Sequence, residues 1–129
     1  MDIRTDFEPH DCFYRHVPAD GVDASGKPKK STCQIKQLKE GMSCDWSKIR
    51  GPDETIYGTG HRQVLCINVQ DCLSLGLTIR HCPSDDVHRP GQINEAHCEI
   101  DLPKGLTDEN TIRRIRDELL KKASIITVG

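Results

Sequence analysis

Hydrophobic residues are distributed unevenly along this chain of 129 residues, and the asymmetry constrains its fold more than any other feature. Of the 27 Leu, Ile and Val residues, 20 follow Gln63. Because burial of apolar surface drives folding, the second half must supply most of the core, and the first half must be rich in loops. The length fits a single domain over 1–129, which buries enough surface to fold without disulfides.

Short stretches of apolar and β-branched residues, separated by turn signals, indicate strands. Four strands are expected, at 12–17, 63–69, 77–81 and 97–102. A brief strand or turn is expected at 34–38, and one or two helical turns at 71–75, which Gly76 ends. The segments expected to lack regular structure are 1–10, which should be loosely held, and two long loops near 19–32 and 47–62.

The clearest helix is predicted over 107–123. Thr107 is a natural N-cap, and the two acidic residues after it favour the positive end of the helix dipole. Apolar residues from Ile112 to Leu119 recur on one helical face, and an edge strand is expected at 125–128. We therefore predict an α+β domain, in which a small mixed β-sheet of four to six short strands packs against one C-terminal helix.

Charge and cysteine usage restrict the class of protein. The net charge of −2 argues against a broad nucleic-acid interface, which needs a basic face, but it leaves room for a small basic pocket. No apolar run approaches the length of a membrane span, and the N-terminus lacks the pattern of a secretory signal. Seven cysteines, an odd number, favour reduced thiols, so we expect a cytoplasmic protein with no membrane partner.

Two His-Cys pairs raise the question of a metal. His81-Cys82 and His97-Cys98 bracket a polar loop, and structural zinc needs four ligands. Adjacent residues of a strand point to opposite faces, so the four side chains cannot all converge if both pairs lie in regular strands. We therefore expect no cofactor and interpret the cysteines as packing residues. Zinc held by His81, Cys82, His97 and Cys98 is the alternative.

The candidate catalytic residues are His16, Asp45, His97 and Glu99. His97 and Glu99 are two residues apart in a predicted strand, so they share a face. An imidazole titrates near neutral pH and a carboxylate can orient it, which suits acid–base catalysis. Arg15, beside His16, would contact a phosphate. The alternative interpretation is the ordinary solvated outer face of a sheet.

Trp46 and the thiols complete the candidate residues. Trp46 is the single tryptophan of the chain and lies in a polar segment. It is either a buried anchor or a platform on which a base stacks, and the second role makes it a candidate substrate contact. Cys72, near a predicted helix N-terminus, is the best-placed thiol nucleophile, although no local signature surrounds it.

Four short islands resemble a set of small uncharacterised bacterial proteins. They are Phe13-Tyr14-Arg15-His16-Val17, Ser43-Cys44-Asp45-Trp46, Leu75-Gly76-Leu77-Thr78 and Ala96-His97-Cys98-Glu99-Ile100. The likeness spans most of the chain. It implies a bacterial cytosolic protein, but that set has no established activity to transfer.

The leading functional hypothesis is a small cytosolic protein whose His/Asp/Glu cluster binds, or acts on, a nucleotide or nucleic-acid phosphate. In an enzyme, His97 would be the general base or acid, Glu99 its orienting group and His16 its partner. Two alternatives stay open. One is a non-catalytic accessory subunit that docks on a larger protein through its long loops and edge strand. The other is a zinc-stabilised binding module.

Overall fold

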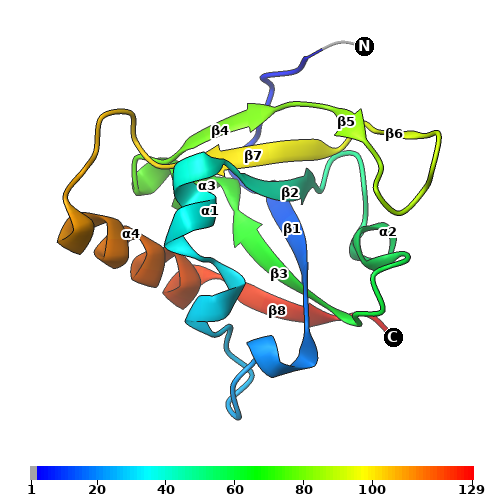
Figure 1. Ribbon diagram of the computed structural model, residues 1–129, viewed down its shortest axis with the longest axis horizontal. Helices are drawn as coiled ribbons and strands as arrows, with labels where there is room; N and C mark the ends of the chain where they lie inside the picture. Colours follow the sequence, from blue (N-terminus) through cyan, green and yellow to red (C-terminus); the bar gives the residue numbers. More distant parts are fainter. Residues whose placement is uncertain (1–2) are drawn as a thin grey trace.

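An antiparallel sheet forms the centre of the fold (Figure 1). The computed structural model describes residues 3–129. Six strands pair in the order β4-β7-β2-β1-β3-β8, and each of these pairings is antiparallel. The strands are β1 (Cys12–Val17), β2 (Met42–Trp46), β3 (Gln63–Asn68), β4 (Thr78–His81), β7 (His97–Asp101) and β8 (Ser124–Thr127). A separate hairpin pairs β5 (Ser84–Asp85) with β6 (Ile93–Asn94).

Helices cover one side of the sheet more completely than the other. They are α1 (Ile35–Glu40), α2 (Pro52–Ile56), α3 (Val69–Ser74) and α4 (Glu109–Lys122), with 3-10 turns at Ala19–Gly21 and Lys30–Thr32. In Figure 1, α1, α3 and α4 gather on one side, whereas α2 and the β5–β6 hairpin lie toward the other. The predicted α+β domain, with its sheet packed against the C-terminal helix, is confirmed, but the sheet predicted as mixed has only antiparallel pairings within residues 3–129.

Alternation along the strands sorts side chains between the two faces. On β1, Phe13 is fully buried in the core on the helix-covered face, whereas His16 is exposed on the opposite face. On β7, Cys98 is buried in the core, whereas His97 and Glu99 lie on the opposite face. His16, His97 and Glu99 are therefore collected on the side that carries α2 and the hairpin, whereas Arg15, two residues after Phe13, leaves β1 on the helix-covered side, near Cys33 and Cys44.

The longest described helix, α4, starts two residues later than predicted. Its N-cap is Asp108 rather than Thr107: the Asp108 carboxylate accepts hydrogen bonds from the hydroxyl of Thr111 and, at 3.1 Å, from its backbone N–H. Ile112 and Leu119 are fully buried against the sheet, as their spacing predicted.

Within residues 3–129, no helix combines the length and apolar composition needed to cross a membrane.

The segment predicted as a brief strand or turn at 34–38 is instead the start of α1. The backbone N–H of Gln34 donates to the side-chain oxygen of Gln37 at 3.2 Å, which closes a capping box. The helix ends at Gly41, whose φ of 98° lies in the region that favours glycine. A Cβ on Gly41 would lie only 2.5 Å from the Glu99 carboxylate, which is a second constraint on this position.

The N-terminal segment is more firmly held than the sequence indicated. The backbone N–H of Arg4 donates to Nδ1 of His81 at 2.9 Å. The ring of Phe7 packs on Trp46, with centroids 4.4 Å apart. These contacts tie the chain from Arg4 onward to the sheet, so the expected loose segment at 1–10 is corrected for its described part, and residues 1 and 2 lie outside the described residues.

Candidate functional site

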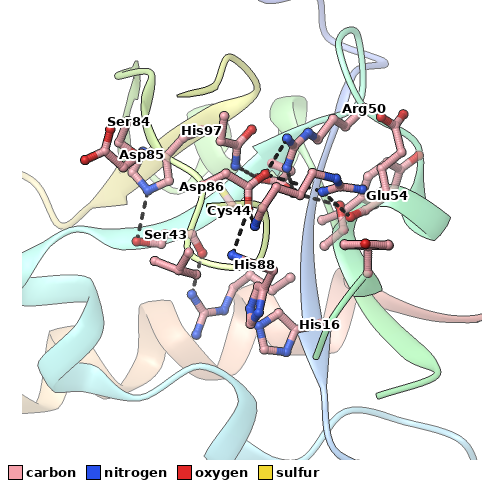
Figure 2. A pocket seen from close by; sticks show the side chains of 18 residues that line it. His16, Ser43, Cys44, Arg50, Glu54, Ser84, Asp85, Asp86, His88 and His97 are labelled. Atoms are coloured by element: carbon pink, nitrogen blue, oxygen red, sulfur yellow. Dashed lines mark hydrogen bonds and ion pairs between the residues drawn. The ribbon is translucent and has the colours of Figure 1, made fainter. Parts of the chain in front are cut away.

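A pocket of about 260 Å³ opens beside the point where β1 and β2 diverge. The two strands pair through Phe13–Trp46 and Tyr14–Asp45, at one end of β1. α2 and the β5–β6 hairpin frame the opening, and Figure 2 shows the side chains that line it. Four residues predicted from the sequence are brought together here: Arg15, His16, Asp45 and His97. Glu99 and Trp46 lie outside the lining.

Trp46 is a buried anchor. Its side chain is fully buried, and its indole N–H donates to the carboxylate of Asp11 at 3.0 Å. Phe7 and His81 pack against its ring, with centroids 4.4 and 5.5 Å away. No ring face is left for a base, so the hypothesis that Trp46 contacts a substrate is corrected: a core with few aromatics uses its largest side chain for packing.

Arg15 is the least compensated cation of the pocket. Its guanidinium reaches from β1 to β2 and donates to the backbone carbonyl of Ser43. Its Nε is buried and has no hydrogen-bond partner among the described residues, and within residues 3–129 no carboxylate forms an ion pair with it. Burial lowers the pKa of this guanidinium. Arg15 is half-buried, and burial of a cation without a counter-charge has a free-energy cost, which makes this position unusual.

Three imidazoles meet beside Arg15. Nδ1 of His16 lies 2.8 Å from Nδ1 of His61, so one of these nitrogens must carry a proton and the other must accept it. The ring of His88 lies 6.0 Å from that of His16, edge to face. Partial burial, followed by the nearby His61, Arg15 and His88, lowers the pKa of His16. His16 is therefore held in a less protonated state than a free imidazole.

The other two arginines of the pocket are neutralised within the protein. Arg50 and Arg89 both contact the buried carboxylate of Asp86, at 2.7 and 3.3 Å. Burial opposes ionisation of Asp86, but Arg50, the backbone N–H of His88 and Arg89 together lower its pKa to about 2. Sequence reasoning missed this cluster because all of its members lie in segments predicted as loops, where no local spacing signals their convergence.

The carboxylate of Asp45 is engaged by other residues of the protein and is not free. It accepts hydrogen bonds from the hydroxyl of Thr55 at 2.9 Å and from the amide of Asn94 at 2.8 Å. These bonds join β2 to α2 and to the β5–β6 hairpin. With both oxygens engaged and Arg50 3.9 Å away, Asp45 shapes the pocket wall more than it offers a base.

His97 is oriented by a backbone carbonyl. Its Nδ1 lies 2.8 Å from the carbonyl oxygen of Cys82, which can only accept, so Nδ1 donates. Nε2 then accepts from the hydroxyl of Ser43 at 3.2 Å. Glu99 shares the face of His97, as predicted, but it forms an ion pair with Arg80. The orienting role predicted for Glu99 thus belongs to the Cys82 carbonyl.

The four residues of the predicted zinc alternative separate into two pairs. His81 and Cys98 are directly opposite on β4 and β7 and both are buried. Nδ1 of His81 accepts from the Arg4 backbone and its Nε2 bonds the Glu95 carbonyl at 2.6 Å, so both nitrogens are occupied. Cys82 and His97 lie together on the other face, where Sγ is 3.4 Å from Nδ1. The four-ligand site is therefore corrected.

Burial makes the core thiols poor nucleophiles. Desolvation raises the pKa of Cys72 to about 12 and that of Cys33 to about 11. Because the thiolate is the reactive form, Cys72 is corrected from a candidate nucleophile to a fully buried core residue.

Comparisons with models of protein families, with curated proteins and with solved structures find no match to this chain.

Proposed function

We propose that the pocket between β1, β2, α2 and the hairpin binds a small phosphate-bearing ligand of the nucleotide class. The observation that carries the proposal is the half-buried side chain of Arg15, whose Nε is buried without a hydrogen-bond partner and which has no carboxylate partner within residues 3–129. An anion in the pocket would supply the missing counter-charge and acceptor. His16 and His88, which line the same pocket, would add protonatable donors.

The remaining charges of the pocket support a small anion rather than a long polyanion. Asp86 contacts both Arg50 and Arg89, and Asp45 lies 3.9 Å from Arg50, so two carboxylates offset the charges of these two arginines. Glu54 and Asp85 also line the pocket and would repel additional phosphates. We therefore favour a mononucleotide over a nucleic-acid strand.

Tyr57 gives the ligand a surface for its base. Its side chain is exposed and lines the pocket, and the Arg89 guanidinium lies 4.1 Å from its ring centroid. An aromatic ring beside an arginine is a common stacking platform for bases. Tyr57 would thus have the stacking role that was one of the two alternatives for Trp46.

We also propose a cytosolic setting, which the seven free cysteines support, because thiols persist in a reducing compartment. A bacterial source is proposed on the resemblance of the four short islands alone.

The test is an NMR titration of isotope-labelled protein with AMP, adenosine and inorganic phosphate. AMP should shift the signals of Arg15, His16 and Tyr57, and inorganic phosphate should shift the first two without Tyr57. Adenosine, the matched control without phosphate, should bind far more weakly than AMP. Equal binding of AMP and adenosine, or no response of Arg15 to either phosphate compound, would contradict the proposal.

A further inference from the structure

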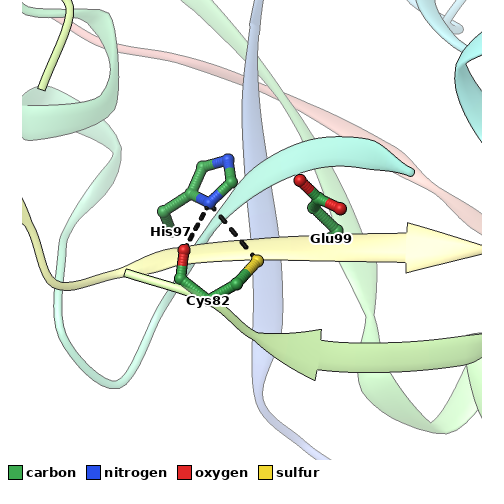
Figure 3. Close-up of side chains that lie close together, drawn as sticks. All are labelled: Cys82, His97 and Glu99. Carbon is green, nitrogen blue, oxygen red and sulfur yellow. Dashed lines mark hydrogen bonds between the residues drawn. The ribbon is translucent and has the colours of Figure 1, made fainter. Parts of the chain in front are cut away.

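Outside the phosphate contacts, one face of the β4–β7 pair collects three metal-binding side chains. Cys82 follows the last residue of β4, and His97 and Glu99 occupy alternate positions of β7. One ligand atom from each of the three lies within 4.8 Å of the other two (Figure 3). All three side chains are half-buried, so a solvated ion can reach them.

We propose that Cys82, His97 and Glu99 bind one divalent cation of the zinc type. Zinc accepts thiolate, imidazole and carboxylate ligands, and three protein ligands with one open position are typical of its catalytic sites. This donor set differs from the predicted one, because it omits His81 and Cys98 and adds Glu99.

The separation of the sulfur and nitrogen atoms fits a shared ion. Zinc bonds of about 2.3 Å to sulfur and about 2.0 Å to nitrogen, at a tetrahedral angle, place the two atoms about 3.5 Å apart. Sγ of Cys82 and Nδ1 of His97 are 3.4 Å apart. A metal would replace the proton that Nδ1 donates to the Cys82 carbonyl, and Nε2 would then carry the proton and donate it to Ser43.

The charges around the site allow the ion to bind without leaving a neighbouring charged side chain unpaired. Arg80 is paired with Glu99, and it also bonds Asp101 at 3.0 Å. If Glu99 turns from Arg80 to the metal, Arg80 keeps the Asp101 carboxylate. Arg80 is therefore a competitor of the ion for Glu99, and its removal should strengthen metal binding.

A second cluster with similar donors does not have these properties. Glu8, His10 and Asp11 also lie within 4.8 Å of one another. Lys48 contacts both Glu8 and Asp11, at 3.0 and 3.9 Å, and the Asp11 carboxylate is engaged by Trp46. Lys48 thus contacts two of the three ligand residues of this cluster, whereas in the Cys82 site Arg80 forms an ion pair with Glu99 alone, and within residues 3–129 no cation pairs with His97 or Cys82.

The test is a Co(II) titration of the reduced, chelator-treated full chain, followed by optical absorption. Cobalt should bind at one equivalent, with the ligand-field bands of a tetrahedral site and a thiolate-to-cobalt charge-transfer band, and Zn(II) should displace it. Cys82→Ser should abolish the charge-transfer band. Cys66→Ser, the matched control, removes another half-buried thiol of the sheet and should keep the band.

Two further variants distinguish a metal site formed by all three side chains from binding by the Cys82 thiol alone. Glu99→Gln should weaken cobalt binding at least about tenfold while the charge-transfer band remains at saturation. Arg80→Met should tighten binding, which an adventitious site would not do. Absence of a saturable charge-transfer band, retention of the band in Cys82→Ser, or weaker binding in Arg80→Met would overturn the proposal. The titration contains no phosphate ligand, so its failure would leave the AMP proposal to its own test.

Discussion

Replacing Trp46 with Phe tests the anchor that joins the N-terminal segment to the sheet. The change removes the hydrogen bond that the indole donates to the buried Asp11 carboxylate at 3.0 Å. A bond to a charged acceptor is worth about 1.5–3 kcal/mol. The smaller ring also leaves a cavity of about 40 Å³, which at about 24 cal/mol per Å³ costs ~1 kcal/mol. Trp46→Phe should therefore lower the free energy of unfolding by about 3 kcal/mol at neutral pH.

The pH dependence of the loss in unfolding free energy separates the contribution of the hydrogen bond from that of the cavity. Burial opposes ionisation of Asp11, but the backbone N–H of Glu8, the Trp46 indole and Lys48 together hold its pKa below the usual 3.8. A lowered carboxyl pKa stabilises the folded state above the pKa of the unfolded chain, and this contribution is lost as the pH falls through the folded pKa. In acid, the cost of Trp46→Phe should shrink toward the cavity contribution.

Urea denaturation of wild type and Trp46→Phe, at neutral and at acidic pH, measures both effects. Asp11→Asn is the matched control, because it keeps an acceptor oxygen and removes the charge, so its unfolding free energy should lack this acid dependence. A loss below about 1 kcal/mol at neutral pH, or a loss that is equal at both pH values, would refute the reasoning.

Three other predictions address the site and the helix. The pKa of His16 is lowered in the free protein, so AMP binding should raise this pKa, take up protons and tighten as the pH falls. Calorimetry in buffers of different ionisation enthalpy should detect the proton uptake. Absence of proton uptake would count against His16 as a contact. The pKa of Asp86 is lowered from the ordinary 3.8 to about 2. Asp86→Asn should therefore lower the free energy of unfolding by about 2 kcal/mol above pH 3.8, and this effect should be lost as the pH falls toward 2. Urea denaturation measures it. Asp108→Ala removes the N-cap of α4 and should lower the urea midpoint measurably, whereas Thr107→Ala should leave it close to that of wild type.

Local patterns predicted those elements whose form depends on their own residues. The period-2 alternation of 97–102 places His97 and Glu99 on one face, and β7 has this arrangement. The apolar spacing of Ile112 and Leu119 likewise predicted the buried face of α4. By contrast, α1 is only six residues long and depends on a side-chain bond between Gln34 and Gln37, which a hydrophobic pattern does not reveal.

The site itself depends on contacts between segments that are distant in sequence. Asp86 meets Arg50 across 36 residues, and Asn94 meets Asp45 across 49. Strand register decides that Arg80 lies opposite Glu99, so the sequence alone could not show that Glu99 is paired. Trp46 illustrates the same limit, because Phe7, one of the residues that pack on its ring, comes from the N-terminal segment.

The most direct test of the pocket is the affinity of Arg15→Gln for AMP, measured by calorimetry beside wild type. Glutamine keeps an N–H donor for the Ser43 carbonyl but has no charge, so the fold should persist while the anion loses its cation. Loss of a charge-assisted bond of about 1.5–3 kcal/mol predicts binding at least about tenfold weaker. Arg113→Gln, on the exposed face of α4, should bind AMP as wild type does. Equal affinity of Arg15→Gln and wild type, with both proteins folded, would contradict the account.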